Sequence, residues 1–318
     1  MKNKILYLVV PCYNEAEVLP ETSKCLLTKL QALIAAERVD PASRILFVDD
    51  GSKDATWSLI DQYHRDNELF VGVKLSHNQG QQNALLAGLT TAYRYADLTI
   101  SLDADLQDDI NAIDRMLDAY EQGAEIVYGV RSARKKDRFL KRFTAQSFYK
   151  LMAKMGVETV YNHADYRLMS KTAVAALLKF DESNLFLRGL IPQLGYPTAT
   201  VEYERKRRLA GKSKYSVKKM FAFALDGITS FSIKPLLLIF WFGLFFSMLG
   251  GAAFVTTLVL HLVLGISSLW AVLSAVLLSV GIVLTALGII GIYLGKLYLE
   301  AKHRPHFIVE KELVTPAK

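Results

Sequence analysis

Charge is missing from a long stretch near the C-terminal end of this 318-residue chain. No Asp, Glu, Lys or Arg occurs between Lys234 and Lys296, where Leu, Ile, Val, Phe and Gly dominate. A transmembrane helix needs about 20 apolar residues, so the stretch can hold two helices and a short turn. We place the helices near 236–260 and 270–294, and the turn at 261–269. A buried hairpin in a soluble domain is the alternative, but such hairpins rarely run this far without a charge.

Further absences narrow the class of protein. The chain has only two cysteines, Cys12 and Cys25, which fits a reducing compartment and gives no metal-binding spacing. No G-x-G-x-x-G follows the first predicted strand and no P-loop lysine occurs, which argues against a dinucleotide oxidoreductase and a P-loop NTPase. The apolar run Ile5–Val10 is too short for a signal peptide and instead predicts a first strand.

Basic residues flank the charge-free stretch on both sides. The turn between the two predicted helices carries no charge, and the net charge of the chain is +7. By the positive-inside rule we predict a multi-pass protein of the plasma (inner) membrane with both termini in the cytoplasm. This location explains the basic charge without nucleic acid as a partner. The flanking residues are Lys206, Arg207, Arg208, Lys212, Lys214, Lys218, Lys219 and Lys234 before the stretch, and Lys296, Lys302 and Arg304 after it.

Short apolar runs alternate with helical patterns in the N-terminal part of the chain. This order predicts an α/β fold with a mostly parallel sheet and helices on both faces. Ligands of such sheets bind beyond the carboxyl ends of the strands. The strands are expected at Ile5–Val10, Arg44–Val48, Val71–Leu75, Leu98–Leu102 and Ile126–Tyr128, and the helices at Ala16–Ala36, Ala55–Asp66, Gln81–Ala92 and Ile110–Glu121.

Polar clusters follow the predicted strands. Pro11–Glu15, Asp49–Ser52, Ser76–Gly80 and Asp103–Asp108 follow the first four strands, and Arg131 follows the fifth. Any one of them could be turn chemistry, because Asp, Gly and Ser favour turns and helix starts. Five clusters at one edge of one sheet instead favour a ligand site.

Asp103 and Asp105 lie two residues apart at the end of a predicted buried strand. Like charges this close resist joint ionisation. A divalent cation removes the conflict, and oxygen ligands of this kind suit Mg²⁺ or Mn²⁺, which usually arrive with a phosphate. An isolated D-x-D is more often structural, since Asp favours caps and turns. The prediction of a metal and nucleotide-diphosphate site therefore depends on the neighbouring clusters.

The chain carries six short motifs in a fixed order: Pro11-x-Tyr13-Asn14-Glu15, Asp49-Asp50-Gly51-Ser52, Asn78-x-Gly80, Asp103-Ala104-Asp105-Leu106-Gln107-Asp108, Asp165-Tyr166-Arg167-Leu168 and Gly211-x-Ser213-Lys214-Tyr215. With this ordered set the chain resembles the family 2 glycosyltransferases, and within them the bactoprenol glucosyltransferase and dolichyl-phosphate mannosyltransferase group. The resemblance covers nearly the whole chain, including the hairpin. It implies a GT-A fold, a nucleotide-sugar donor, Mg²⁺ or Mn²⁺, and a polyprenyl-phosphate acceptor.

The resemblance also implies roles for individual residues. Asp105 and Gln107 would ligate the metal, with Asp103 beside it. Arg131 and Asp165 would line the reacting centre together with Arg167, and the two arginines would meet the acceptor phosphate. The nucleotide sugar would be bound by Pro11, Tyr13, Glu15, Asp49, Asp50 and Asn78, and its diphosphate by Arg205 and Lys214. The catalytic set is then Asp103, Asp105, Asp165 and Arg131.

The expected chemistry is displacement of a nucleoside diphosphate from the anomeric carbon of the sugar. A metal together with Arg205 and Lys214 would stabilise the charge that develops on the leaving diphosphate. A phosphate monoester acceptor needs no general base, because its second pKa is about 6. Asp165 is therefore either an orienting group or a base. Inversion at the sugar is implied by the resemblance, with UDP-glucose or UDP-N-acetylglucosamine as the expected donor and GDP-mannose as the alternative.

The chain should also contain an interfacial helix next to the membrane. Apolar residues recur at helical spacing before the first span, which is typical of a helix lying along the bilayer. A second stretch, 139–155, fits an interfacial or a core helix equally well. Glycines in the two spans permit close packing and assembly of copies into a homo-oligomer. The expected parts are a cytoplasmic GT-A domain at 1–215, the interfacial helix at 216–233, the hairpin at 234–295 and a cytoplasmic tail at 296–318.

Two other functions are less well supported. A processive polysaccharide synthase would carry a Q-x-x-R-W motif and more spans, but none of Trp57, Trp241 and Trp270 follows an arginine. A non-catalytic membrane scaffold or nucleotide-sugar sensor would have a degraded metal motif. Asp103, Asp105 and Gln107 are all present, which favours the enzyme.

Overall fold

The computed structural model describes residues 4–131, 163–180, 182, 186–204, 234–264 and 269–314. The described chain divides into two compact units. The first, the sheet unit, contains the chain up to residue 204 and the segment that begins at Pro305. The second, the helical unit, contains the two long helices up to Arg304. The predicted interfacial helix at 216–233 and the stretch 139–155 lie outside the described residues.

The first part of the sheet unit alternates strands and helices as the sequence predicts. Each boundary differs from the expected one by a few residues at most, and Arg131 belongs to the end of β5 instead of following it. The elements are β1 (Leu6–Cys12), α1 (Leu19–Ala35), β2 (Arg44–Asp49), α2 (Thr56–Asp66), β3 (Phe70–Leu75), α3 (Gln81–Tyr93), β4 (Leu98–Ser101), α4 (Ala112–Glu121) and β5 (Ile126–Arg131).

Several further elements complete the described chain. The sequence predicted the two long apolar helices, α9 and α10, but it did not predict the other elements individually. The further elements are β6 (His163–Ser170), α6 (Lys171–Leu177), α7 (Leu187–Leu190), the 3₁₀ helix η1 (Ile191–Leu194), β7 (Thr198–Tyr203), α9 (Lys234–Leu264), α10 (Leu269–Glu300) and β8 (Val309–Leu313).

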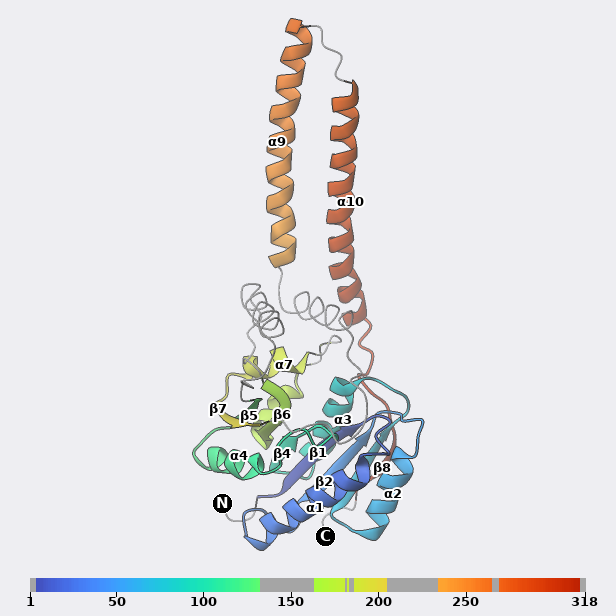
Figure 1. The fold of residues 1–318 in the computed structure, drawn as a ribbon, viewed down its shortest axis with the longest axis vertical. Helices are drawn as coiled ribbons and strands as arrows, with labels where there is room; N and C mark the ends of the chain where they lie inside the picture. The colour runs from blue at the N-terminus through green and yellow to red at the C-terminus, as the bar shows by residue number, and fades with distance from the viewer. Residues whose placement is uncertain are drawn as a thin grey trace. The chain divides into compact units, whose positions relative to one another are not determined.

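The eight strands form one sheet in the order β7-β5-β6-β4-β1-β2-β3-β8 (Figure 1). β1 pairs in parallel with β2 and β4, as do β2 with β3 and β5 with β7. β6 runs antiparallel between β4 and β5, and β8 runs antiparallel to β3. The sheet is therefore mostly parallel, as predicted, and the first residues of β6 lie beside the carboxyl ends of β4 and β5.

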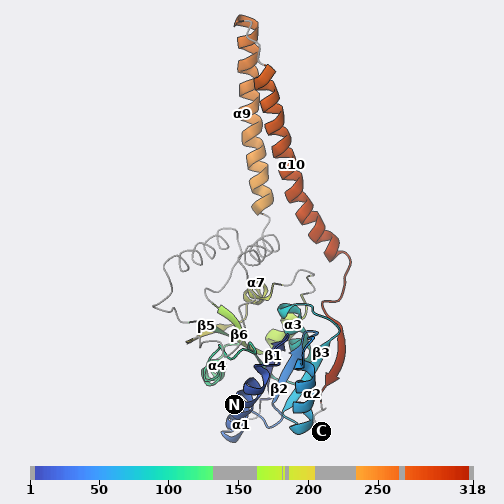
Figure 2. The same cartoon turned by 45° about the vertical axis from the view of Figure 1, so that its right-hand side comes forward.

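Side-chain alternation along β1 explains how helices cover both faces. Leu6 and Leu8 belong to a core cluster with apolar residues of α1, α2 and α4. Val9 points to the other face, where α3 packs so closely that a Cβ on Gly88 would lie 2.4 Å from a Val9 methyl and 2.8 Å from Val48. Strand residues alternate between faces, so one buried strand supplies both cores. The helices on the two faces can be followed in Figure 2.

The segment after the second long helix returns to the sheet. β8 pairs with β3, and just beyond the pair the backbone N–H of Ser76 donates to the carbonyl of Ile308 at 2.9 Å. Lys74 of β3 forms an ion pair with Glu310 of β8 at 2.9 Å. The stretch expected only as a tail therefore supplies an edge strand, next to the loop that follows β3.

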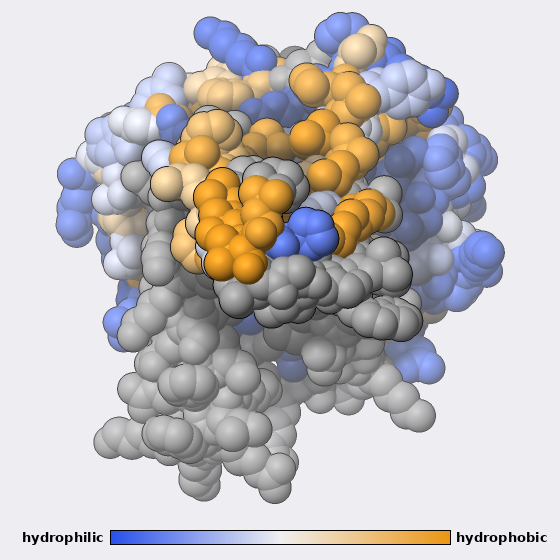
Figure 3. Space-filling model, turned by 90° about the horizontal axis from the view of Figure 1, so that it is seen from above, coloured by the Kyte–Doolittle hydropathy of each residue, from blue (hydrophilic) through white to orange (hydrophobic). Residues whose placement is uncertain are grey.

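The helical unit contains two apolar helices. α9 has 31 residues and α10 has 32, and both contain candidate membrane spans by length and composition, Leu236–Val263 and Ser279–Glu300. Large hydrophobic side chains such as Met248, Leu262 and Leu294 are exposed on them. The space-filling view of Figure 3 shows hydrophobic side chains gathered on the surface of these helices. Helices with so much exposed apolar surface are suited to a bilayer.

Candidate active site

Loops that follow β1 and β2 are hydrogen-bonded to each other at the carboxyl edge of the sheet. The backbone N–H of Asn14 donates to the Ser52 hydroxyl at 2.9 Å, and the Asn14 side-chain oxygen accepts from the N–H of Lys53 at 2.8 Å. The N–H of Glu15 donates to the Thr56 hydroxyl at 3.0 Å. Two of the predicted motifs thus form one structure.

Asp50 organises the loop that follows β3. Its buried carboxylate accepts hydrogen bonds from the Asn78 side chain at 2.9 Å and from the backbone N–H groups of Gln79 and Gly80 at 2.7 and 2.9 Å. Burial raises the pKa of Asp50, and these two backbone hydrogen bonds oppose the shift. Gly51 has a φ of +65°, and a Cβ there would lie 2.5 Å from the backbone of the same loop, so only glycine fits.

Asp49 lies beside this structure and is fully buried. One of its oxygens accepts from the N–H of Ser52 at 3.2 Å, whereas the other has no hydrogen-bond partner in the described part of the chain. Burial raises the pKa of Asp49. Pro11 and Tyr13 are only partly buried at the same edge. The predicted nucleotide residues thus include buried groups that shape loops as well as partly exposed side chains at the same edge.

The acidic motif after β4 is held in an unusual backbone conformation. Leu106 has a positive φ of 53°, which non-glycine residues adopt at a cost of about 1–2 kcal/mol. The N–H of Gln107 donates to the Asp105 carboxylate at 3.1 Å, and the Gln81 amide donates to Asp103 at 2.8 Å. Strain of this kind is common where a fold fixes functional side chains.

The negative charges of three other carboxylates act on Asp103. Burial, followed by the charges of Asp108, Asp165 and Asp105, raises the pKa of Asp103 to about 7. Such mutual repulsion is relieved when a cation binds between the groups. The structure therefore brings together three of the predicted catalytic carboxylates, and the positive charge of Arg131 partly compensates them at Asp103.

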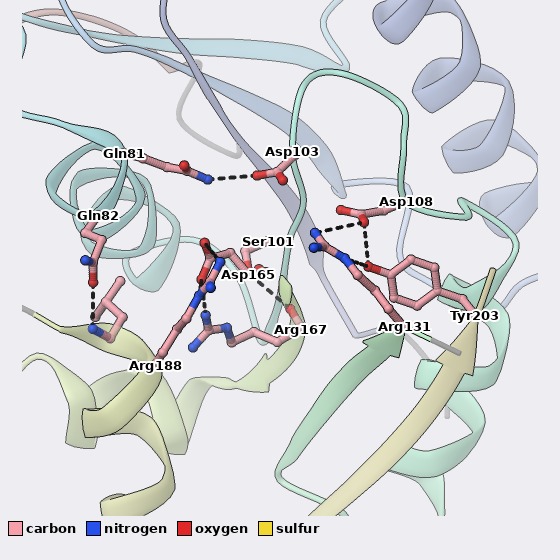
Figure 4. A network of polar contacts seen from close by, with 11 residues as sticks. Gln81, Gln82, Ser101, Asp103, Asp108, Arg131, Asp165, Arg167, Arg188 and Tyr203 are labelled. Carbon is pink, nitrogen blue, oxygen red and sulfur yellow. Dashed lines mark hydrogen bonds and ion pairs between the residues drawn. The ribbon is translucent and has the colours of Figure 1, made fainter. Parts of the chain in front are cut away.

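Arg131 is joined to the acidic motif through a tyrosine. The Tyr203 hydroxyl donates to Asp108 at 2.5 Å, and the Arg131 Nε donates to the Tyr203 oxygen at 3.4 Å (Figure 4). An Arg131 Nη atom lies 4.0 Å from the same Asp108 oxygen. Burial and Asp108 raise the pKa of Tyr203, so its proton stays in place at neutral pH. β5, β7 and the acidic loop are thus linked at the site.

Asp165, at the start of β6, is held by two arginines. One carboxylate oxygen accepts from Arg167 Nη2 at 2.8 Å and from Arg188 Nε at 3.1 Å, and the other accepts from Arg188 Nη2 at 3.0 Å. The Ser101 hydroxyl donates to the Asp165 carbonyl at 2.5 Å. Figure 4 shows Arg188 reaching this carboxylate from α7. Both oxygens of Asp165 are engaged by guanidinium groups.

The residues of the acidic motif fit an open divalent-metal site. Among the described residues, no group of three or more His, Cys, Asp or Glu side chains is arranged to hold a metal ion by itself. Mg²⁺ usually binds one or two carboxylates and takes substrate phosphates as further ligands. Asp103, Asp105 and Gln107 offer such oxygen donors, and the pKa of Asp103 is raised by burial and then by the negative charges around it.

Some site residues were predicted and others were not. Arg205 and Lys214 lie outside the described residues, so their predicted contact with the donor diphosphate stays a prediction. Arg188 and Gln82 had no motif that could have revealed them. Gln82 accepts a hydrogen bond at 2.8 Å from the N–H of Leu187, a residue 105 positions away. Asp108 is the last residue of the acidic motif, and its place in that motif is the only feature of the sequence that could have indicated a role at the site.

Comparison with known proteins assigns the chain to a family. The model described as Glycosyl transferase family 2 matches residues 7–178. The protein belongs to this family and is a glycosyltransferase with a GT-A-like α/β fold.

Individual relatives resemble the chain over most of its length. It is 47% identical over 313 residues to the uncharacterized glycosyltransferase YkoT of Bacillus subtilis (strain 168), covering 97% of this chain and 92% of the relative. It is 40% identical over 311 residues to the bactoprenol glucosyl transferase of Shigella phage SfV, covering 96% and 98%. Among solved structures, glucosyl-3-phosphoglycerate synthase from Mycobacterium tuberculosis is 14% identical with a TM-score of 0.46, covering 71% of this chain and 78% of that one.

Proposed function

We propose that this protein transfers a sugar from a UDP-sugar, UDP-glucose or UDP-N-acetylglucosamine, to undecaprenyl or another polyprenyl phosphate. The product is a lipid-phosphate-linked monosaccharide for glycosylation of the cell envelope. The observation that carries the proposal is the 40% identity to the bactoprenol glucosyl transferase of phage SfV across 96% of this chain. So long a match includes the candidate membrane spans as well as the sheet unit.

The donor is proposed to bind at the carboxyl edge of β1 to β4. The loops tied together by Asp50 would hold the nucleoside, and Asp103, Asp105 and Gln107 would hold Mg²⁺ or Mn²⁺ beside the diphosphate. When bound, the ion supplies Lewis-acid stabilisation of the leaving group. Arg205 and Lys214 would add positive charge at the same phosphates. No protein acid is then required on the leaving nucleotide.

The acceptor side is proposed to involve Arg131, Asp165 and Arg167. A phosphate monoester is largely dianionic at neutral pH and attacks without a general base. Both oxygens of Asp165 accept hydrogen bonds from arginines, which supports an orienting role for this carboxylate and not a proton-accepting one. A single displacement would invert the configuration at the sugar.

The membrane arrangement is proposed from the chain's connections. β3 precedes both candidate spans and β8 follows both, yet the two strands are hydrogen-bonded in one sheet. The chain must therefore cross the membrane an even number of times between them. Together with the basic flanks, this supports a hairpin with the sheet unit and both termini in the cytoplasm.

The test is a donor panel with the full-length protein. We would incubate the purified protein in lipid nanodiscs with undecaprenyl phosphate, Mg²⁺ or Mn²⁺, and separate UDP- and GDP-sugars, and then identify the lipid product by mass. We expect transfer from a UDP-hexose. Transfer from GDP-mannose alone would contradict the donor, and no lipid-linked sugar from any donor would contradict the proposal.

A further inference from the structure

Two buried tyrosines hold the end of the acidic motif. The Tyr166 hydroxyl donates to the backbone carbonyl of Asp109 at 3.0 Å, and the Tyr203 hydroxyl donates to the Asp108 carboxylate at 2.5 Å. The two tyrosines are only 1% and 2% exposed. A buried tyrosine hydroxyl usually takes a hydrogen-bond partner, and both of these hydroxyls take theirs from the same loop.

The two rings contact each other although another strand lies between them. Tyr166 belongs to β6 and Tyr203 is the last residue of β7, and β5 separates these strands in the sheet. The ring centroids are 5.3 Å apart, and the rings meet edge to face at 81°. Gly129 of β5 leaves the space for this contact, because a Cβ there would lie 2.9 Å from the Tyr166 carbonyl and 3.0 Å from a carbon of its ring. The two residues therefore pack as a tyrosine pair.

The acidic loop is held at its beginning as well as at its end. The buried Thr22 hydroxyl of α1 donates to the Ala104 carbonyl at 2.6 Å. Leu106, with its positive φ of 53°, lies between this contact and the tyrosine pair. A strained turn persists only where the surrounding contacts over-determine its backbone. The proposed metal ligands Asp105 and Gln107 flank Leu106, so the same contacts that keep the strained turn also fix the backbone of these two residues.

From these contacts we infer that Tyr166 and Tyr203 are positioning residues for the metal, because they hold the acidic loop in the shape that receives the ion. This inference rests on the proposed function, in which the acidic motif binds Mg²⁺ or Mn²⁺. A site that is shaped in advance binds its ligand more tightly, since less of the loop remains to be ordered. The inference gives a role to the tyrosine of the fifth sequence motif, and it adds Tyr203, which lies in none of the motifs.

The experiment compares Tyr203→Phe, Tyr166→Phe and the double variant with the wild type, all as full-length protein in nanodiscs. Phenylalanine keeps each ring and removes only the hydroxyl. Binding of UDP is measured by calorimetry over a range of Mn²⁺ concentrations and again without metal, and thermal unfolding is recorded for each variant. No acceptor is present, so the contact between Tyr203 and Arg131 cannot act through the acceptor. Tyr7→Phe is the matched control, because Tyr7 is a buried tyrosine of β1 that stacks on Tyr95.

We expect Tyr203→Phe to raise the Mn²⁺ concentration for half-maximal UDP binding by about tenfold, the loss associated with one hydrogen bond to a charged group. Tyr166→Phe loses a bond to a neutral carbonyl and should raise it by about threefold to fivefold. The double variant should lose less than the product of the two effects, because the rings are in contact. Saturating Mn²⁺ should restore UDP binding to within about twofold of the wild type by mass action, which a general folding defect would not allow. Metal-free UDP binding should not change, and Tyr7→Phe should match the wild type.

Two results would overturn the inference. One is a Mn²⁺ requirement that both single variants leave unchanged while UDP binding by the wild type depends on Mn²⁺. The other is UDP binding that is weakened equally with and without Mn²⁺, because it would assign the tyrosines to the general stability of the domain. A wild type whose UDP binding does not respond to Mg²⁺ or Mn²⁺ would instead contradict the proposed metal site itself, so the two failures are distinguishable.

Discussion

At Asp105 a substitution can remove the charge of the side chain while keeping its shape and its hydrogen bond. Its carboxylate accepts the N–H of Gln107 at 3.1 Å, a contact that asparagine can keep. Asp105→Asn should therefore fold normally but lower kcat by at least about a hundredfold, because the charge proposed to bind the metal is lost. Thermal unfolding, sugar transfer and calorimetric binding of Mn²⁺ with UDP would check this.

The matched control for Asp105 lies in the same loop. Asp109→Asn also removes one charge, at a side chain that accepts the N–H of Asn111 at 3.3 Å. We expect this variant to keep its metal binding and its activity. Full activity of Asp105→Asn under limiting metal would show that Asp105 is not a metal ligand.

Gly51 is the residue that allows the loops after β2 and β3 to meet. Alanine there would be strained at a φ of +65° and would also press against the backbone of His77 at 2.5 Å. Gly51→Ala should cost more than the roughly 1 kcal/mol of a strained φ alone. It should also weaken UDP binding, because the loop held by Asp50 must shift.

Gly123 provides the comparison for Gly51. It also has a positive φ, +102°, but a Cβ there would meet no atom within 4 Å. Gly123→Ala should lose about 1 kcal/mol in the free energy of unfolding and leave UDP binding unchanged. Equal UDP binding in both variants, measured by calorimetry, would contradict the importance of the close approach at Gly51.

At the scale of elements, α7 is a short helix that depends on its neighbours. Four residues are too few for a helix to be stable by itself, and the N–H of Leu187 relies on the Gln82 side chain. Gln82→Leu keeps the volume but removes the acceptor. Since α7 carries Arg188, which forms an ion pair with Asp165, we expect a severalfold to tenfold loss in kcat/KM for the acceptor.

Gln82→Glu tests whether the hydrogen bond is the cause. A glutamate oxygen can accept from the same N–H, so this variant should stay within about threefold of the wild type. Activity in nanodiscs and thermal unfolding would be measured for both variants. If Gln82→Leu and Gln82→Glu behave alike, α7 is positioned by other contacts.

Elements were predictable where their signal is local. Ile5–Val10 and Leu98–Leu102 are apolar runs long enough for buried strands, and both appear in the sheet with small changes at their ends. β8 reads Val-Glu-Lys-Glu-Leu, which is mostly charged and has no such signal. It becomes a strand because β3 offers an open edge and because Lys74 compensates Glu310. Such pairing depends on residues far away in the chain, which periodicity cannot reveal.

At the scale of the whole molecule, the hairpin and the strand that follows it can be tested separately. We would replace residues 217–304 by a Gly/Ser linker of about 30 residues, which is flexible enough to leave β8 free to pair. This variant should fold and bind UDP with Mn²⁺. Its turnover of undecaprenyl phosphate in bilayers should fall about tenfold or more, since the enzyme is no longer concentrated at the membrane.

A chain cut after Lys214 is the informative comparison. It loses β8 as well as the hairpin, so β3 becomes an exposed edge and the domain should be less stable and bind UDP more weakly. Undiminished turnover of long-chain acceptor by the linker variant would contradict the proposed role of the hairpin.

The candidate site was predictable in part because its motifs follow strands. Asp103, Asp105 and Asp165 come together because the antiparallel β6 begins at the edge of the sheet where β4 ends. The residues that orient these carboxylates could not be predicted from the sequence. Arg188 lies 23 residues from Asp165 and Tyr203 lies 95 residues from Asp108, and neither belongs to a recognisable motif. Their contacts result from the order of the strands in the sheet, which brings distant parts of the chain together.

The pairing of β8 with β3 also determines the stage of translation at which the sheet can be completed. Lys74 and Glu310 are separated by 236 residues, and both long helices are encoded between them. During translation β3 leaves the ribosome first, and β8 follows only after the two helices have been made. Until then the edge of β3 keeps unpaired N–H and C=O groups. The two candidate membrane helices are thus made before the sheet can be completed, so a newly made chain contains both of them before its eighth strand exists.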